Sequence, residues 1–115
     1  MKKELPDADA VEKQAYLQGF RQIFVIKGNS MLPTLKNDDC VIFNPELKPK
    51  IGDIILFQHP FIQNLKVVKR ISEITPEGNF IVLGDNPSES TDSRSYGAIL
   101  AKNILGVAVC RFDGE

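Results

Sequence analysis

The sequence predicts an all-β domain, a small, partly closed barrel or folded sheet, preceded by a short N-terminal helix. From residue 23 onward, short runs rich in β-branched and aromatic residues alternate with Gly, Pro, Asn and Asp, which mark tight connections between strands. No helical repeat of apolar residues interrupts these runs. The chain of 115 residues is long enough for one hydrophobic core and too short for two. Many short strands around one core are typical of barrels and folded sheets.

The predicted strands follow one another at short intervals. They are IFVIKG (23–28), CVIFNP (40–45), DIILFQHP (53–60), KVVKRISEI (66–74), NFIVLGD (79–85) and ILGVAVCRF (104–112). The stretch ITPEGNFIV, which joins the fourth run to the fifth, predicts a hairpin. Pro76 fixes its own φ there, and Gly78 is free to adopt a positive φ.

The first 22 residues differ from the rest and predict a short amphipathic helix. Asp9 and Glu12 have the spacing of a capping box, and Leu17, Phe20 and Phe24 recur at helical intervals. We expect this helix to dock on the barrel and not to lie on a membrane, because its apolar face is short and its polar face is not rich in lysine. The chain thus divides into an N-terminal helical extension (1–22) and a core domain (23–115).

Charge and hydropathy narrow the classes of function. The net charge of −1 and the pI near 5.8 give no basic field, so we expect no nucleic-acid partner. No apolar stretch approaches the length that crosses a bilayer, and the charged first 20 residues lack the apolar middle of a signal peptide. The expected location is therefore cytoplasmic or membrane-peripheral, with peripheral contact as the closest association with a membrane.

Neither the cysteines nor the histidine predicts a metal site. Cys40 and Cys110 each lie in an apolar run, where a cysteine behaves as a small core side chain; a disulfide between them is the less favoured alternative. His59, the single histidine, lies in the turn FQHPF without the partners that catalysis or ligation requires. We therefore expect His59 to be structural or solvated, and the protein to need neither a metal nor a cofactor.

One serine stands out as a candidate nucleophile. Ser30 lies in GNSMLPTL, directly after the first apolar run. A serine hydroxyl needs a positioned base, and a lysine can serve if burial lowers its pKa until the amine is neutral. Lys69 lies inside the apolar run KVVKRI, where strand alternation can turn it toward the core. Composition alone favours the interpretation of Lys69 as an ordinary strand lysine.

The order of three motifs along the chain resembles the signal peptidase I family of serine–lysine proteases. That family combines a Ser-Met box, a strand with Lys-Arg, and a Gly-Asp-Asn box that ends in Ser-x-Asp-Ser-Arg. The resemblance covers about residues 23 to 112 and implies the all-β fold of signal peptidases and LexA-like proteins, with 23–115 as a serine–lysine catalytic core. Here the boxes read Ser30-Met31-Leu32-Pro33-Thr34, Lys69-Arg70, Gly84-Asp85-Asn86 and Ser90-Thr91-Asp92-Ser93-Arg94.

The resemblance also implies roles for individual residues. Ser30 would be the nucleophile of a serine endopeptidase, and Lys69, uncharged in a dry pocket, would take its proton. Ser90 resembles the serine that hydrogen-bonds the lysine amine and orients it. The implied structural ion pairs are Asp92 with Arg94 and Asp85 with Arg70.

Two further positions bear on substrate and rate. Gly28 stands where family members have a serine or a glycine that helps line the oxyanion hole, so the backbone N–H of Ser30 must stabilise the oxyanion without a side-chain hydroxyl. Met31 offers a polarizable side chain that either packs under an extended substrate or fills the core. A peptide substrate would add a strand to an exposed sheet edge.

The resemblance implies removal of an N-terminal leader or signal-type segment from a protein substrate. Family members normally carry a membrane anchor, and bacterial ones a large inserted domain, neither of which the sequence shows. The compact form is similar to mitochondrial inner-membrane peptidases, and more so to the anchorless maturation proteases that trim nickel-type superoxide dismutase.

Two other functions remain open at this stage. LexA- and UmuD-like proteins share the fold and cleave themselves, but 22 residues cannot supply a DNA-binding domain, and the usual Ala-Gly or Cys-Gly cleavage dipeptide is absent. A catalytically inactive β-barrel binding module would keep the fold without contact between Ser30 and Lys69. The sequence leaves the oligomeric state undetermined.

Overall fold

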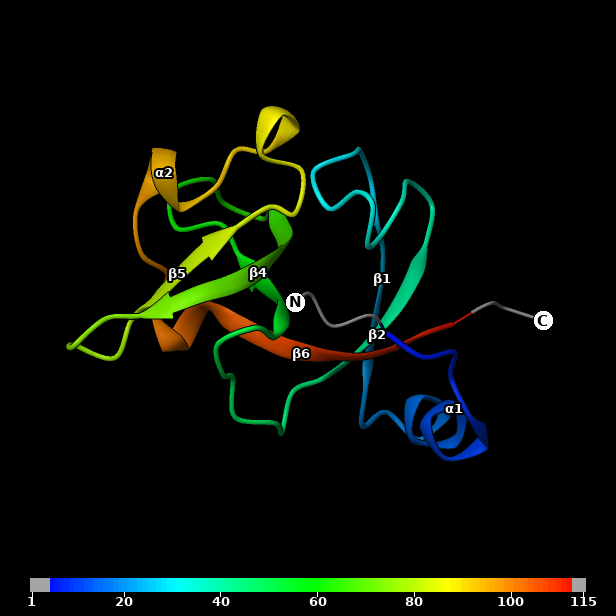
Figure 1. The fold of residues 1–115 in the computed structure, drawn as a ribbon. Helices are drawn as coiled ribbons and strands as arrows, with labels where there is room; N and C mark the ends of the chain where they lie inside the picture. Colours follow the sequence, from blue (N-terminus) through cyan, green and yellow to red (C-terminus); the bar gives the residue numbers. More distant parts are fainter. Residues whose placement is uncertain (1–4, 113–115) are drawn as a thin grey trace.

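Six antiparallel strands form one sheet in the computed structural model, which describes residues 5–112 (Figure 1). The sheet order is β1-β2-β6-β3-β4-β5. The prediction of a mainly β folded sheet with a short N-terminal helix is confirmed. The strand bounds are β1 Gln22–Val25, β2 Cys40–Asn44, β3 Ile54–Gln58, β4 Lys66–Ile74, β5 Phe80–Leu83 and β6 Ile104–Arg111.

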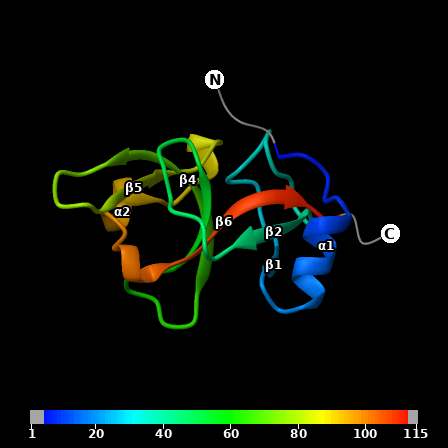
Figure 2. The ribbon, with the colours of Figure 1, turned by 90° about the horizontal axis from the view of Figure 1, so that it is seen from below.

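Register shifts bend the sheet at three of its five strand pairings. They lie between Ile42 and Phe43 on β2, between Leu56 and Phe57 on β3, and between Ile71 and Glu73 on β4. Such irregularities increase the local twist and curve the strand that carries them. In Figures 1 and 2, β6 crosses from the β1–β2 half of the molecule to the β4–β5 half. The edge strands β1 and β5 do not pair with each other, so the barrel stays open.

The two faces of β3 pack into two separate hydrophobic clusters. Ile54 and Leu56 point into one, and Ile55 and Phe57 point into the other, as expected when successive strand side chains alternate between faces. Because the strand is buried on both faces, its sequence is a continuous apolar run without alternation. The first cluster also contains Ile26, Met31, Leu35, Val41, Phe43 and Val68, and the second Ile71, Phe80, Val82, Ile99 and Val107.

Helix α1 (Ala10–Leu17) begins where the capping box predicts, because the Asp9 side chain accepts the Glu12 N–H at 2.9 Å. It ends earlier than the apolar spacing predicts. Gly19, with φ of +87°, follows the helix, and Phe24 lies on β1. The expected apolar face is therefore wrong: Leu17 is 75% and Phe20 is 60% exposed.

Helix α1 contacts residues that flank the sheet through polar and aromatic side chains. Glu12 pairs with Arg21 at 2.8 Å, and the Tyr16 and Phe112 ring centroids lie 6.2 Å apart. Just before the helix, Pro6 and Ala8 exchange backbone hydrogen bonds with Arg111 of β6. The N-terminal segment is thereby fixed to the sheet. Within residues 5–112, no helix is both long and apolar enough to cross a membrane.

The connections between the later strands carry the rest of the regular structure. The β4–β5 hairpin closes as predicted, with Gly78 at φ of +85° and the Thr75 N–H bonded to the Asn79 carbonyl at 2.8 Å. Cys40 and Cys110 are both free thiols. Between β5 and β6 lie the 3₁₀ helix η1 (Pro87–Glu89), helix α2 (Ser93–Tyr96) and the 3₁₀ helix η2 (Ala101–Asn103).

Candidate active site

Ser30 lies in a turn that its own neighbours anchor to the core. Gly28 enters the turn with φ of +87°, and its N–H donates to the Asn37 side chain at 2.8 Å. After Ser30, the side chains of Met31 and Leu35 are buried in the first cluster, and the Leu35 N–H donates to the Met31 carbonyl. The serine is therefore presented on a backbone that is fixed on both sides.

Lys69 meets Ser30 from the middle of β4. Its amine donates a hydrogen bond to Ser30 Oγ at 2.8 Å, although 39 residues separate the two in sequence. Lys69 is only 5% exposed, and it lies opposite Ile55 in the sheet. Burial lowers the pKa of the Lys69 amine below its ordinary 10.5, while the negative charge of Asp92 partly opposes that shift.

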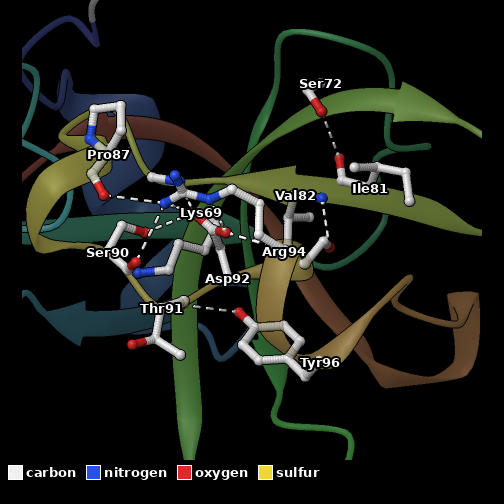
Figure 3. Close-up of polar contacts among 12 residues, drawn as sticks. Lys69, Ser72, Ile81, Val82, Pro87, Ser90, Thr91, Asp92, Arg94 and Tyr96 are labelled. Atoms are coloured by element: carbon white, nitrogen blue, oxygen red, sulfur yellow. Dashed lines mark hydrogen bonds and ion pairs between the residues drawn. The ribbon is translucent and has the colours of Figure 1, made fainter.

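Asp92 is a fully buried carboxylate that organises the loop after β5. It accepts hydrogen bonds from the Ser90 hydroxyl at 2.8 Å and from Arg94 Nε at 2.9 Å (Figure 3), and it also accepts one from the Gly84 N–H at 3.0 Å. Burial by itself would raise the pKa of this carboxyl, but the hydrogen bonds from Arg94, Gly84 and Ser90 outweigh it and lower the pKa to about 2. Asp92 is therefore ionised at neutral pH.

Ser90 belongs to the hydrogen-bond network of Asp92. Its hydroxyl donates to Asp92 Oδ2, and in Figure 3 the Lys69 side chain reaches toward it. A hydroxyl has one proton and two lone pairs, so a Ser90 that donates to Asp92 still offers a lone pair to an amine. The hydroxyl of Ser90 is therefore bonded to Asp92, and its predicted hydrogen bond with the Lys69 amine stays a prediction.

Gly84 allows three segments of the site to approach one another. A methyl group built on its Cα would overlap the Ser90 hydroxyl and would lie 2.7 Å from the Ser30 carbonyl oxygen. Its φ is not positive, so space alone requires glycine here. The sequence shows a Gly-Asp-Asn box but gives no sign that its glycine lies against both serines.

We expect Gly84→Ala to lower the free energy of unfolding by about 1–3 kcal/mol, because the added methyl group overpacks the site. It should also reduce peptide cleavage, since Ser30 or Ser90 must move. Urea unfolding and a cleavage assay measure the two effects. Gly78→Ala is the matched control: its methyl group meets open space in the distal hairpin turn, so only the positive φ is strained. Equal losses of activity in both variants would contradict the prediction.

An ion pair behind the site connects the Ser30 turn to β4. Arg70 binds Asp85 in a bidentate pair, at 2.8 and 2.9 Å, and also donates to the Gly52 carbonyl at 2.7 Å. Thr34, four residues after the serine, donates to the same Asp85 carboxylate at 2.6 Å. The sequence resemblance marked Asp85 and Arg70 as partners, but Thr34 was missed as their third member.

His59 makes hydrogen bonds that hold the loop in which it lies. Its Nδ1 accepts hydrogen bonds from the N–H groups of Phe61 and Ile62 at 3.0 and 3.1 Å, and its ring centroid lies 4.7 Å from that of Tyr96. These bonds close the loop between β3 and β4. The hydrogen bond that reaches Ser30 Oγ from a basic side chain comes from Lys69.

A cavity of about 290 Å³ opens beside Ser30 between two strand edges. Within the described residues, β1 pairs only with β2, and the first part of β4 pairs only with β3, because β5 joins β4 from Arg70 onward. The outer edge of β1 and the first part of β4 therefore have unpaired backbone groups, and both strands contribute residues to the lining of the cavity. Its lining consists of Phe24, Ile26, Lys27, Ser30, Met31 and residues 65–69.

Comparison with known proteins identifies the family of the chain. A family model described as Peptidase S24-like matches residues 6–109. A signal peptidase IB from Staphylococcus aureus is 35% identical over 88 residues, which cover 75% of this chain and 44% of that protein. A signal peptidase I from Leptolyngbya laminosa is 30% identical over 138 residues and covers 76% of this chain and 66% of the relative. The chain thus spans less than half of the staphylococcal relative.

Proposed function

The chain belongs to the S24-like peptidase family as a signal peptidase I-like member, and on that premise we propose that it is a serine endopeptidase with a Ser30–Lys69 dyad. The homology supports serine peptidase activity. The finer proposal is that the protein removes an N-terminal leader or signal-type segment from a protein substrate. The observation that carries the dyad proposal is the 2.8 Å hydrogen bond between Ser30 and an almost fully buried lysine.

The proposed reaction begins when Lys69 is neutral. Its lone pair accepts the Ser30 proton while Ser30 Oγ attacks the carbonyl carbon of the scissile peptide bond. The backbone N–H of Ser30 donates to the resulting oxyanion, and within the described part of the chain this N–H has no other acceptor. As the intermediate collapses, Lys69 returns the proton to the leaving amine. A water then hydrolyses the acyl ester on Ser30, with Lys69 again as the base.

The substrate would bind as an added strand between the two open edges beside Ser30. Backbone groups of β1 and of Lys66–Lys69 would hydrogen-bond an extended peptide, and its alternate side chains would enter the cavity. Ile26, Met31 and Val68 line that cavity, so it favours apolar side chains near the cleaved bond. In this proposal Met31 serves both the core and the substrate.

A cleavage assay tests the proposed function. The protein is incubated with extended peptides that carry small apolar residues at varied positions, including the leader of nickel-type superoxide dismutase, and the fragments are identified by mass spectrometry. The Ser30→Ala protein provides the background. We expect fragments only with the native serine. Identical fragments in both samples, or bound but uncleaved peptide throughout, would contradict the proposal, and the second outcome would favour a binding module.

A further inference from the structure

We propose that Asn86 is a positioning residue that aims the Ser30 N–H at the oxyanion. This inference rests on the proposed peptidase function and assigns a role to a side chain outside the dyad. Asn86 follows β5 and precedes η1, more than 50 residues from the nucleophile in sequence. Its two nitrogen atoms donate to two successive carbonyl groups of the Ser30 turn.

The contacts form a clamp on both sides of the nucleophile. The Asn86 backbone N–H donates to the Ser30 carbonyl at 2.9 Å, and the Asn86 side-chain amide donates to the Asn29 carbonyl at 3.0 Å. The amide orientation is itself fixed, because its nitrogen also donates to Glu89 at 3.2 Å while its oxygen accepts from the Ser88 hydroxyl at 3.4 Å. In this orientation the side-chain nitrogen of Asn86, and not its oxygen, faces the Asn29 carbonyl.

Peptide geometry links this clamp to catalysis. The Asn29 carbonyl and the Ser30 N–H belong to one planar trans peptide unit and point in opposite directions. A hydrogen bond that holds the carbonyl from one side therefore sets the direction of the N–H on the other. Since Gly28 offers no hydroxyl, the Ser30 N–H has no side-chain donor from that position to assist it. An error in its direction should therefore affect the rate strongly.

The chemistry of the clamp distinguishes asparagine from its nearest analogue. Aspartate in place of Asn86 would keep the size of the side chain and the backbone bond to Ser30. It would replace the amide donor by a carboxylate oxygen, which repels the Asn29 carbonyl and the nearby Glu89. Asn86→Asp should therefore be at least as harmful as Asn86→Ala.

Steady-state kinetics of Asn86→Ala and Asn86→Asp test the inference. We expect kcat to fall about 10- to 100-fold with KM nearly unchanged. The pH dependence of kcat should keep its position, because Lys69 is untouched. Thr75→Val is the matched control: it removes one side-chain acceptor of a backbone N–H, at the distal end of the β4–β5 hairpin, and should lower stability without lowering kcat.

Inhibitor binding distinguishes a misdirected Ser30 N–H from a general weakening of peptide binding in the Asn86 variants. A substrate-derived peptide aldehyde forms a hemiacetal with Ser30 that places its oxygen at the oxyanion position, whereas the corresponding alcohol forms no such bond. The aldehyde should bind the Asn86 variants more weakly by the factor lost in kcat, while the alcohol should bind equally well. A rise in KM with unchanged kcat, or equal weakening of aldehyde and alcohol, would overturn the inference. Absence of Ser30-dependent cleavage in the native protein would instead refute the proposed function.

Discussion

Replacing Lys69 by methionine is expected to lower kcat/KM for peptide cleavage at least about a thousandfold, as much as Ser30→Ala does. Methionine keeps the length and apolar packing of the buried side chain but has no basic nitrogen to accept the Ser30 proton. The folded state should be preserved or strengthened, because a buried amine is exchanged for an apolar group. Cleavage kinetics and thermal unfolding of the two variants measure both effects.

The pH dependence of cleavage by the native protein provides the complementary observation. Only the neutral amine acts as a base, so kcat/KM should rise about tenfold per pH unit until pH exceeds the lowered pKa of Lys69, and then level off. His59→Ala should leave the position of this rise unchanged, since His59 bonds the β3–β4 loop. If kcat/KM instead rose between about pH 6 and 7, and this rise disappeared in His59→Ala, Lys69 would not be the base.

Acidification from pH 4 to pH 2 should remove about 2 kcal/mol of stability through Asp92 alone. The pKa of this carboxyl is about 2 in the folded protein, against an ordinary 3.8, so the unfolded chain binds the proton more readily. Its contribution is therefore complete above about pH 4 and is lost as pH falls toward 2. Urea unfolding at a series of pH values measures the free energy directly.

Asp92→Asn isolates this carboxyl from the other acidic groups. Asparagine keeps an oxygen for the Gly84 N–H but lacks the charge that Arg94 binds, so the variant should be destabilised by about 2–4 kcal/mol at neutral pH. The difference in stability between the native protein and the variant should shrink as pH falls from 4 to 2. A difference that stays constant over this interval would contradict the assigned role of Asp92.

Local sequence signals predicted the strands well because each is set by nearby residues. The run at 66–74 coincides with β4, four other runs each contain one strand, and the first run overlaps β1, which begins one residue earlier, at Gln22. The sequence did not predict the strand order, in which β6 inserts between β2 and β3, since such pairing depends on contacts between distant segments. The helix was predicted too long because Gly19 interrupts a spacing that continues by chance to Phe24 on β1.

In the candidate site, the sequence predicted the residues whose side chains could take part directly in the reaction. Ser30 and Lys69 could be nominated as a pair from the order of the motifs, and strand alternation allowed burial of the lysine. Thr34 and Asn86 were missed because they act through hydrogen bonds to a distant loop, for which the sequence has no local pattern. Thr34 belongs to the Ser-Met box and Asn86 to the Gly-Asp-Asn box. Membership in a motif does not indicate which distant residue each side chain contacts.

The incomplete closure of the sheet also exposes the molecule to self-association. Unpaired strand edges bind any extended chain, including an unfolded copy of the same protein, and so compete with a productive peptide. The exposed side chain of Lys66 lines the cavity, and a charged side chain at such a position hinders edge-to-edge aggregation. The charge of Lys66 therefore opposes the stacking of further copies along the open edge.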